Sequence, residues 1–147
     1  MKLNFNKTIL IAEIGWNFLG NLSLAKRMIR EAKKSGADAV KFQLWNPKNL
    51  KSGSWDYDGR RELYNKSFLS YDKFKHLYKF SQKIKIECFA SVFSKQDLNI
   101  HKKINKRIIK IPSSEAYDIN LIKLALRNFS KVIVSTGTLK KKELLKL

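Results

Sequence analysis

Cysteine, acidic residues and long apolar runs are scarce in this 147-residue sequence, and each scarcity excludes a class of protein. The single cysteine, Cys88, excludes an internal disulfide and suits a reducing compartment, so we expect a cytoplasmic protein. No apolar run approaches the ~20 residues that span a bilayer, and Met1–Lys7 lacks the apolar core of a signal peptide. We therefore expect no membrane association. Hydrophobic residues make up 44% of the chain, enough for one domain with its own core.

The shortage of acid leaves a large positive charge. Only 12 acidic residues stand against 31 basic ones, and the net charge is +19. This charge favours anionic ligands and makes a basic nucleic-acid-binding protein one alternative. Lysine supplies 25 of the basic residues and is spread over every predicted helix, whereas arginine is the usual residue for base and phosphate recognition. No zinc-finger spacing, RNP motif or helix-turn-helix is present. We therefore disfavour nucleic acid as the partner.

Buried strands and amphipathic helices alternate along the chain. Strand, helix and strand at this spacing form a βαβ unit, whose strands are parallel. The order therefore predicts an α/β fold, with a parallel sheet and helices packed on it. Side chains that cap helices precede four of the predicted helices, and a further helix is predicted to start at Thr138. The caps are Asn21, Ser70, Ser94 and Asp118, and the predicted strands are Thr8–Glu13, Ala37–Gln43, Ile84–Ser91, the run around Lys110, and Lys131–Ser135.

Each predicted strand ends in polar side chains. Ligands bind at the C-terminal edge of a parallel α/β sheet. Two lysines and three serines suit a small dianion with phosphate and carboxylate groups, and two glutamates remain for hydroxyl recognition or proton transfer. Lys110 lies in an apolar strand, where a lysine is costly to bury unless an anion meets it; a surface strand is the alternative. The candidate residues are Glu13, Lys41, Gln43, Ser91, Lys110, Ser113, Glu115 and Ser135.

Five segments, in their order and spacing, resemble the N-terminal half of the N-acetylneuraminate (sialic acid) synthase family. They are IAEIGWN, ADAVKFQ, the FASVF strand end, IKIPSSE and VSTGT. The resemblance implies a transferase that condenses phosphoenolpyruvate with an N-acylated amino sugar, giving a nonulosonic (sialic-type) acid and phosphate. It also implies parallel (β/α) units of a TIM barrel, incomplete with about five of the eight strands. Residues 1–147 would then form a single domain, the N-terminal part of that barrel.

The resemblance also assigns roles at the phosphoenolpyruvate site. Lys41 and Ser91 would hold the carboxylate of phosphoenolpyruvate. Lys110, Ser113 and Ser135 would hold its phosphate. Ser91 stands where the family usually has threonine, so a serine hydroxyl must take over that contact.

The two glutamates would serve the sugar and the reacting atoms. By resemblance, Glu13 binds hydroxyls of the open-chain sugar, and Glu115 lies near the reacting carbons and handles a proton. Gln43 fits as a supporting polar contact. Phe18 departs from the family, which usually has histidine after the turn asparagine. Such departures bear on the identity of the sugar more than on the phosphoenolpyruvate site.

The family also implies a divalent metal, manganese or magnesium, held by two histidines of later strands. The histidines present, His76 and His101, lie on predicted helices, and His101 falls on an apolar stripe typical of the core edge. We therefore expect no metal ligands in this chain and no activity from it alone. A homodimer or a complementary second-half chain is the expected partner. A small flavodoxin-like anion-binding domain is the remaining alternative.

The long connection Leu44–Leu69 is too long and too aromatic for a simple linker. It holds two clusters of aromatic and charged residues, Trp55–Asp58 and Arg60–Glu62. One interpretation is a lid over the sugar, because tryptophan faces stack on sugar rings. The other is packing across the mouth of the barrel. The sequence leaves both open.

Overall fold

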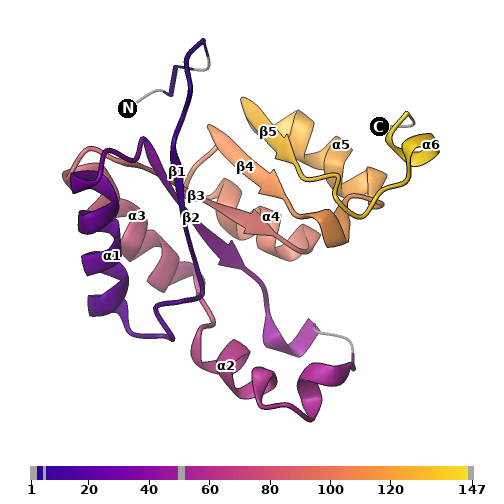
Figure 1. Cartoon of the computed structure of the whole chain (residues 1–147), viewed down its shortest axis with the longest axis horizontal. Helices are drawn as coiled ribbons and strands as arrows, with labels where there is room; N and C mark the ends of the chain where they lie inside the picture. The colour runs from indigo at the N-terminus through magenta and orange to yellow at the C-terminus, as the bar shows by residue number, and fades with distance from the viewer. Residues whose placement is uncertain (1–2, 5, 50–51, 146–147) are drawn as a thin grey trace. The chain divides into compact units, whose positions relative to one another are not determined.

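The computed structural model describes residues 3–4, 6–49 and 52–145 (Figure 1). Its strands follow one another in the sheet in chain order, β1-β2-β3-β4-β5. Strand and helix alternate as the sequence predicts. The strands are β1 (Ile11–Gly15), β2 (Ala39–Leu44), β3 (Glu87–Val92), β4 (Ile108–Ile111) and β5 (Lys131–Val134). The helices are α1 (Leu22–Lys34), α2 (Arg60–Lys66), α3 (Tyr71–Lys83), α4 (Lys95–Lys102), α5 (Ile119–Asn128) and α6 (Lys141–Leu144), with short 3-10 turns η1 (Pro47–Asn49), η2 (Ser54–Asp56) and η3 (Ser113–Glu115).

The chain divides into two compact units, one within Met1–Phe89 and the other within Ala90–Leu147. The division falls inside β3, so this strand contributes residues to both. No helix in the described ranges is long and apolar enough to cross a membrane.

The first unit is a βαβ unit with an aromatic core. Strands β1 and β2 pair in parallel, and the Asn21 side chain caps α1 by accepting a hydrogen bond from Leu24 N at 3.0 Å, as predicted. Phe18, Phe42 and Phe74 are fully buried and meet edge to face, with ring centroids 5.9 and 6.4 Å apart. The phenylalanine at position 18 therefore serves as a core residue of this unit.

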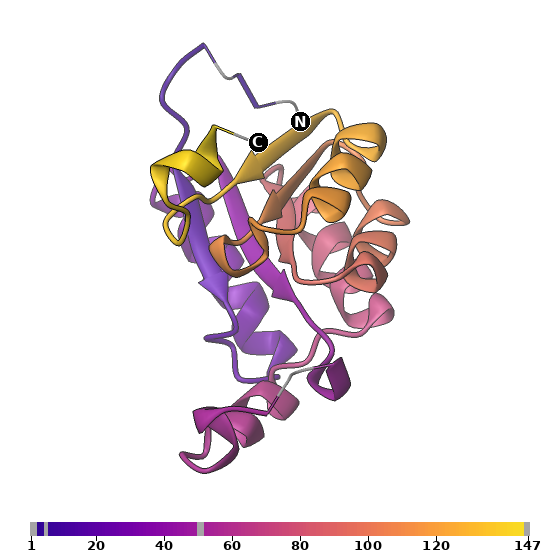
Figure 2. The ribbon, with the colours of Figure 1, turned by 90° about the vertical axis from the view of Figure 1, so that its right-hand side faces the viewer.

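The second unit pairs β4 with β5 in parallel over four residues, from Ile108 opposite Lys131 to Ile111 opposite Val134. Helix α5 begins after Asp118, the predicted cap, whose carboxylate accepts a hydrogen bond from Leu121 N at 2.9 Å. Helices α4 and α5 pack side by side (Figure 2). Short apolar strands and capped helices thus build this unit from local signals.

Several element boundaries differ from prediction, among them those of β2, which spans Ala39–Leu44 instead of Ala37–Gln43. Strand β1 starts at Ile11 instead of Thr8 and runs to Gly15. Strand β3 starts at Glu87 instead of Ile84, because the turn that ends α3 places Lys85 in the left-handed region (φ +60°). The last helix starts at Lys141, three residues after the predicted start at Thr138.

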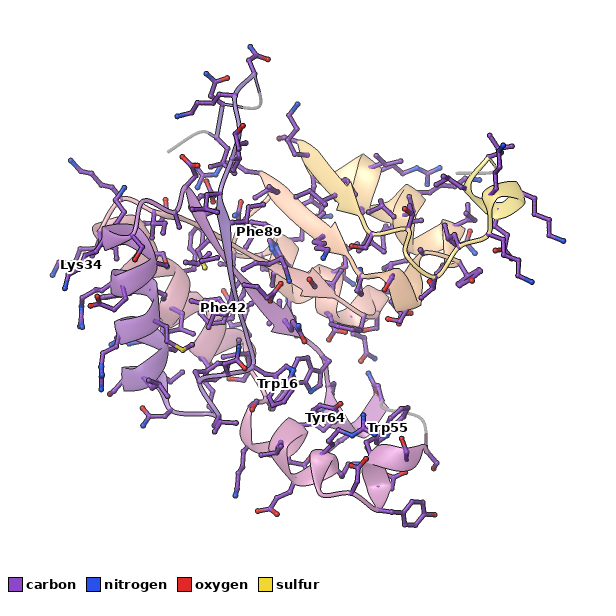
Figure 3. The ribbon with its side chains drawn as sticks, viewed as in Figure 1. Trp16, Lys34, Phe42, Trp55, Tyr64 and Phe89 are labelled. Carbon is purple, nitrogen blue, oxygen red and sulfur yellow. The ribbon has the colours of Figure 1, made fainter. Side chains whose placement is uncertain are left out.

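The long connection after β2 is a folded insert. Arg61 holds it by donating to the Asp56 carboxylate at 2.6 Å and to the Pro47 carbonyl at 3.1 Å. The Tyr64 ring meets Trp16 edge to face at a centroid distance of 6.0 Å (Figure 3). It also meets the Trp45 ring edge to face, at 5.7 Å. The insert is therefore anchored to the segments that follow β1 and β2. The two interpretations of this connection, a lid over the sugar and packing across the mouth of the barrel, both stay predictions.

Candidate functional site

In the first unit, Lys41 and Glu13 form an ion pair across two neighbouring strands. Glu13 and Lys41 are register partners of β1 and β2, so both side chains lie on one face of the sheet. The Lys41 side chain is 5% exposed, whereas that of Glu13 is 47% exposed. A buried ammonium group is costly without an anion, and Glu13 supplies that anion while keeping contact with solvent. The positive charge of Lys41 is therefore balanced, and the Glu13 carboxylate remains accessible to solvent.

Gly15 gives the neighbouring polar groups room. The pairing of β1 with β2 shifts register between Glu13 and Gly15, and Gly15 has φ +56°. A Cβ at Gly15 would lie 3.2 Å from Glu13 Oε1 and 3.4 Å from Gln43 Nε2. The Glu13 carboxylate and the Gln43 amide therefore converge over this glycine. The structure thus brings together three of the predicted site residues, Glu13, Lys41 and Gln43.

In the second unit, Ser91 and Lys110 are register partners of the parallel strands β3 and β4. Ser91 is 2% exposed and Lys110 is half-buried. Lys110 is in turn paired with Ile133 of β5, and Ser135 lies two residues further along. Register partners have side chains on the same face of a sheet, so Ser91 and Lys110 share a face, and Ser135 follows directly after the end of β5. This arrangement puts one cation and two hydroxyl groups at the C-terminal ends of three strands.

Hydrogen bonds tie the turn after β4 to the turn after β5. The Thr138 hydroxyl donates to the Ser113 carbonyl at 2.6 Å, and the Tyr117 hydroxyl donates to the Thr138 carbonyl. Ser135 N donates to the Ile111 carbonyl at 3.0 Å. The segments that carry Ser113 and Ser135 are therefore held beside each other. The sequence did not identify Tyr117 and Thr138 as parts of this link, because no local motif predicts a hydrogen bond between residues more than 20 positions apart.

Glu115 lies in η3, where the Ser114 hydroxyl donates to its carboxylate at 3.0 Å. A second carboxyl group, Asp97, is 3% exposed and accepts a hydrogen bond from the Ser94 hydroxyl at 2.6 Å. Burial raises the pKa of Asp97, the Ser94 hydrogen bond opposes that rise, and the charge of Glu115 adds to it. Asp97 lies three residues after Ser94, the cap that the sequence predicts for this helix.

The described ranges contain no group of three or more histidine, cysteine, aspartate or glutamate side chains that could hold a metal ion. His101 is fully buried, deeper than the core edge predicted for it, and both its ring nitrogens are in hydrogen-bond contact with backbone atoms. His76 is exposed on α3. The residues that the structure describes therefore do not fit the family's metal.

Two relatives with assigned functions cover nearly all of the chain. The pseudaminic acid synthase of Campylobacter jejuni strain 81-176 is 35% identical over 98% of this chain and 46% of that protein. The N,N'-diacetyllegionaminic acid synthase of Campylobacter jejuni is 32% identical over 89% of this chain and 42% of that protein. The chain therefore spans about half the length of the relatives it matches.

A solved structure confirms the fold. The sialic acid synthetase of Leptospira borgpetersenii, crystallised in complex with citrate, superposes with a TM-score of 0.83 at 32% identity. The match covers 99% of this chain and 52% of that one. The predicted fold class, parallel (β/α) units of a TIM barrel, is thereby confirmed. The NeuB family matches residues 28–146, and this chain is a member of the NeuB family.

Proposed function

We propose that this chain carries the phosphoenolpyruvate-binding half of a nonulosonic acid synthase. The reaction condenses phosphoenolpyruvate with an N-acylated amino sugar and releases phosphate. The names of the relatives support this class, since they are synthases of pseudaminic and legionaminic acids. The sugar itself is not fixed by these names, because the relatives make different acids.

The observation that carries the proposal is the in-register pair of Ser91 and Lys110. A half-buried ammonium group beside hydroxyl groups, at the C-terminal ends of parallel strands, suits an oxyanion. In this proposal, Lys110, Ser113 and Ser135 bind the phosphate group. Ser91 binds the carboxylate of the same ligand.

In the first unit, Lys41 is proposed to bind the phosphoenolpyruvate carboxylate, and Glu13 to bind hydroxyl groups of the sugar. Their ion pair keeps the buried ammonium compensated while no substrate is present. Gln43, next to Glu13 over Gly15, supplies a further polar contact. Glu115 is proposed to handle a proton near the reacting carbons.

The proposed reaction balances without any oxidant or reductant. The methylene carbon of phosphoenolpyruvate attacks the aldehyde carbon of the open-chain sugar, forming the new carbon–carbon bond. Water adds to the carbon that carries the phosphate ester, and phosphate leaves as the keto group forms. This chain's residues bind and orient the anionic substrate in these steps. We propose that residues 1–147 alone do not turn over, and that a complementary half or a second copy completes the site.

Phosphate release tests the proposal. Residues 1–147 are assayed with phosphoenolpyruvate and N-acetylmannosamine or another N-acylated amino sugar. The assay is run alone and after fusion to the C-terminal half of the Campylobacter jejuni pseudaminic acid synthase. We expect phosphoenolpyruvate binding by both forms and sugar-dependent phosphate release by the fusion only. A folded fusion that binds no phosphoenolpyruvate would refute the proposed function.

A further inference from the structure

His101 in α4 is a buried side chain with defined hydrogen bonds on both sides of its ring. Ala90 N donates to His101 Nε2 at 3.0 Å, and His101 Nδ1 lies 3.0 Å from the Asn105 carbonyl oxygen. A backbone N–H only donates and a carbonyl only accepts, so the hydrogen of the ring is on Nδ1 and the lone pair on Nε2. The ring is therefore held as one neutral tautomer. The Phe129 ring meets it edge to face at 5.3 Å.

The same contacts continue to the start of β4. The Asn105 side-chain oxygen accepts a hydrogen bond from Arg107 N at 2.7 Å, and β4 begins at the next residue. We call the chain of contacts through Ala90, His101, Asn105 and Arg107 the His101 relay. It connects the backbone of β3, one residue before Ser91, with the backbone that leads into β4. His101 has no exposed surface, so its influence on any ligand passes through this backbone.

The two strands need such a link, because they pair over a short stretch. In the described part of the chain, the register of β3 with β4 rests on a single pair, Ser91 with Lys110. By comparison, β4 and β5 pair over four residues. A slip of one residue turns every side chain of a strand to the opposite face. A slip here would therefore separate the Ser91 hydroxyl from the Lys110 ammonium group.

We propose that His101 is a positioning residue for the oxyanion site, because its relay fixes the β3–β4 register that sets Ser91 beside Lys110. This inference rests on the function proposed above. A hydrogen-bond role and a packing role make different predictions. If His101 only fills space, an apolar side chain of similar size replaces it. If the relay matters, the replacement must accept a hydrogen bond from Ala90 N.

Two substitutions and one control separate these roles in the full 147-residue chain. His101→Leu fills the space and leaves Ala90 N without its acceptor, whereas His101→Gln offers a carbonyl oxygen at the end of its side chain. His76→Leu removes the other histidine, which is exposed. Each variant is titrated with phosphoenolpyruvate, and its thermal unfolding is recorded. We expect His101→Leu to weaken binding about tenfold, equivalent to about 1.4 kcal/mol, and His101→Gln to stay within about threefold of the unmodified chain.

The outcomes distinguish the relay from the proposed function. A folded His101→Leu variant with unchanged affinity overturns the positioning role, and unchanged affinity in His76→Leu is expected throughout. If His101→Leu does not fold, the test rests on a folded His101→Gln variant. Retained affinity of that variant for phosphoenolpyruvate supports the positioning role, and lost affinity overturns it. An unmodified chain that binds no phosphoenolpyruvate refutes the proposed function and the positioning role with it. Separately, nitrogen NMR of the ring must show the hydrogen on Nδ1 at neutral pH; a hydrogen on Nε2 overturns the relay itself.

Discussion

Lys41 and Glu13 face each other in register across two parallel strands, and the buried ammonium group takes its compensation from a carboxylate that is half exposed. This asymmetry matters for ligand binding. An incoming carboxylate meets a cation that already has a partner, and the partner is itself a proposed sugar-binding group. The two substrates are therefore expected to be coupled through this one ion pair.

Glu13→Gln tests that coupling. The substitution removes the negative charge beside Lys41 and keeps the shape of the side chain. We expect the catalytic efficiency of the fused enzyme toward the sugar to fall strongly, while phosphoenolpyruvate affinity is unchanged or increased. Without ligand, the variant should lose about 1–3 kcal/mol of stability, because the buried ammonium group loses a charged acceptor. Phosphoenolpyruvate should restore the melting temperature. Equal losses for both substrates in separate titrations would contradict the assignment.

Gly15→Ala tests whether the space over this glycine serves the site. Gly15 has φ +56°, where an L side chain costs about 1–2 kcal/mol, and the new methyl group would press on Glu13 and Gln43. Gly36→Ala is the matched control, because Gly36 has φ +86° and no atom within 4 Å of the added Cβ. Both variants should lose stability in chemical denaturation. Only Gly15→Ala should also impair use of the sugar, and a similar impairment in Gly36→Ala would show that strain alone is responsible.

The sequence predicts well what short-range chemistry decides. Asn21, Ser70 and Asp118 each cap a helix in the structure, since the hydrogen bond joins residues three apart. Pro112 follows the last residue of β4, where a residue without an N–H group cannot donate to a sheet ladder. The left-handed backbone conformation of Lys85 was not predictable from the sequence, because non-glycine residues rarely adopt a φ of +60°.

Contacts between distant segments escaped prediction. His101 bonds to a residue 11 positions away and Thr138 to one 25 positions away, and no periodic pattern encodes either contact. The candidate lysines and serines were found because parallel strands deliver their ends to one edge. The groups that hold those ends in place became visible only in three dimensions.

Lys110→Ala tests the proposed phosphate site. Loss of a charge-assisted contact should weaken phosphoenolpyruvate binding by about 1.5–3 kcal/mol, which is about 10- to 150-fold. Lys123→Ala is the matched control, because Lys123 is exposed on α5 and its loss changes the net charge equally. Titrations at two salt concentrations separate a specific contact from general attraction to a basic protein. Similar weakening by both variants would remove Lys110 from the site.

Thr138→Val and Tyr117→Phe test the hydrogen bonds that hold Ser113 and Ser135 together. Each variant removes one hydroxyl donor from the link between the two turns. We expect each to weaken phosphoenolpyruvate binding by about 0.5–1.5 kcal/mol. The double variant should lose less than the sum of the two, because both bonds support the same arrangement. Strict additivity would indicate that the two hydroxyl groups act independently.

Buried His101 predicts how stability depends on pH. Burial lowers the pKa of His101 to about 4, and the hydrogen bond with Asn105 opposes that shift only in part. The unfolded chain binds a proton near pH 6.5, about two and a half units higher, so protons favour the unfolded state between these values. Above pH 6.5 the ring is neutral in both states, and its contribution to the free energy of unfolding has its full value. It falls as the pH drops towards 4, by about 3 kcal/mol in total.

Urea unfolding from pH 4 to 8 measures this dependence. The comparison is between the unmodified chain and His101→Gln, which keeps an acceptor for Ala90 N but does not titrate. The difference in unfolding free energy between them should narrow as the pH falls. Only the unmodified chain has a histidine at position 101 that binds a proton when the chain unfolds, so only this chain loses stability from that group in acid. His76→Leu is the matched control for the removal of a histidine, since His76 is exposed. A difference that stays constant from pH 8 to 4 would mean that the His101 ring is protonated inside the fold, and a protonated ring cannot accept the hydrogen bond from Ala90 N.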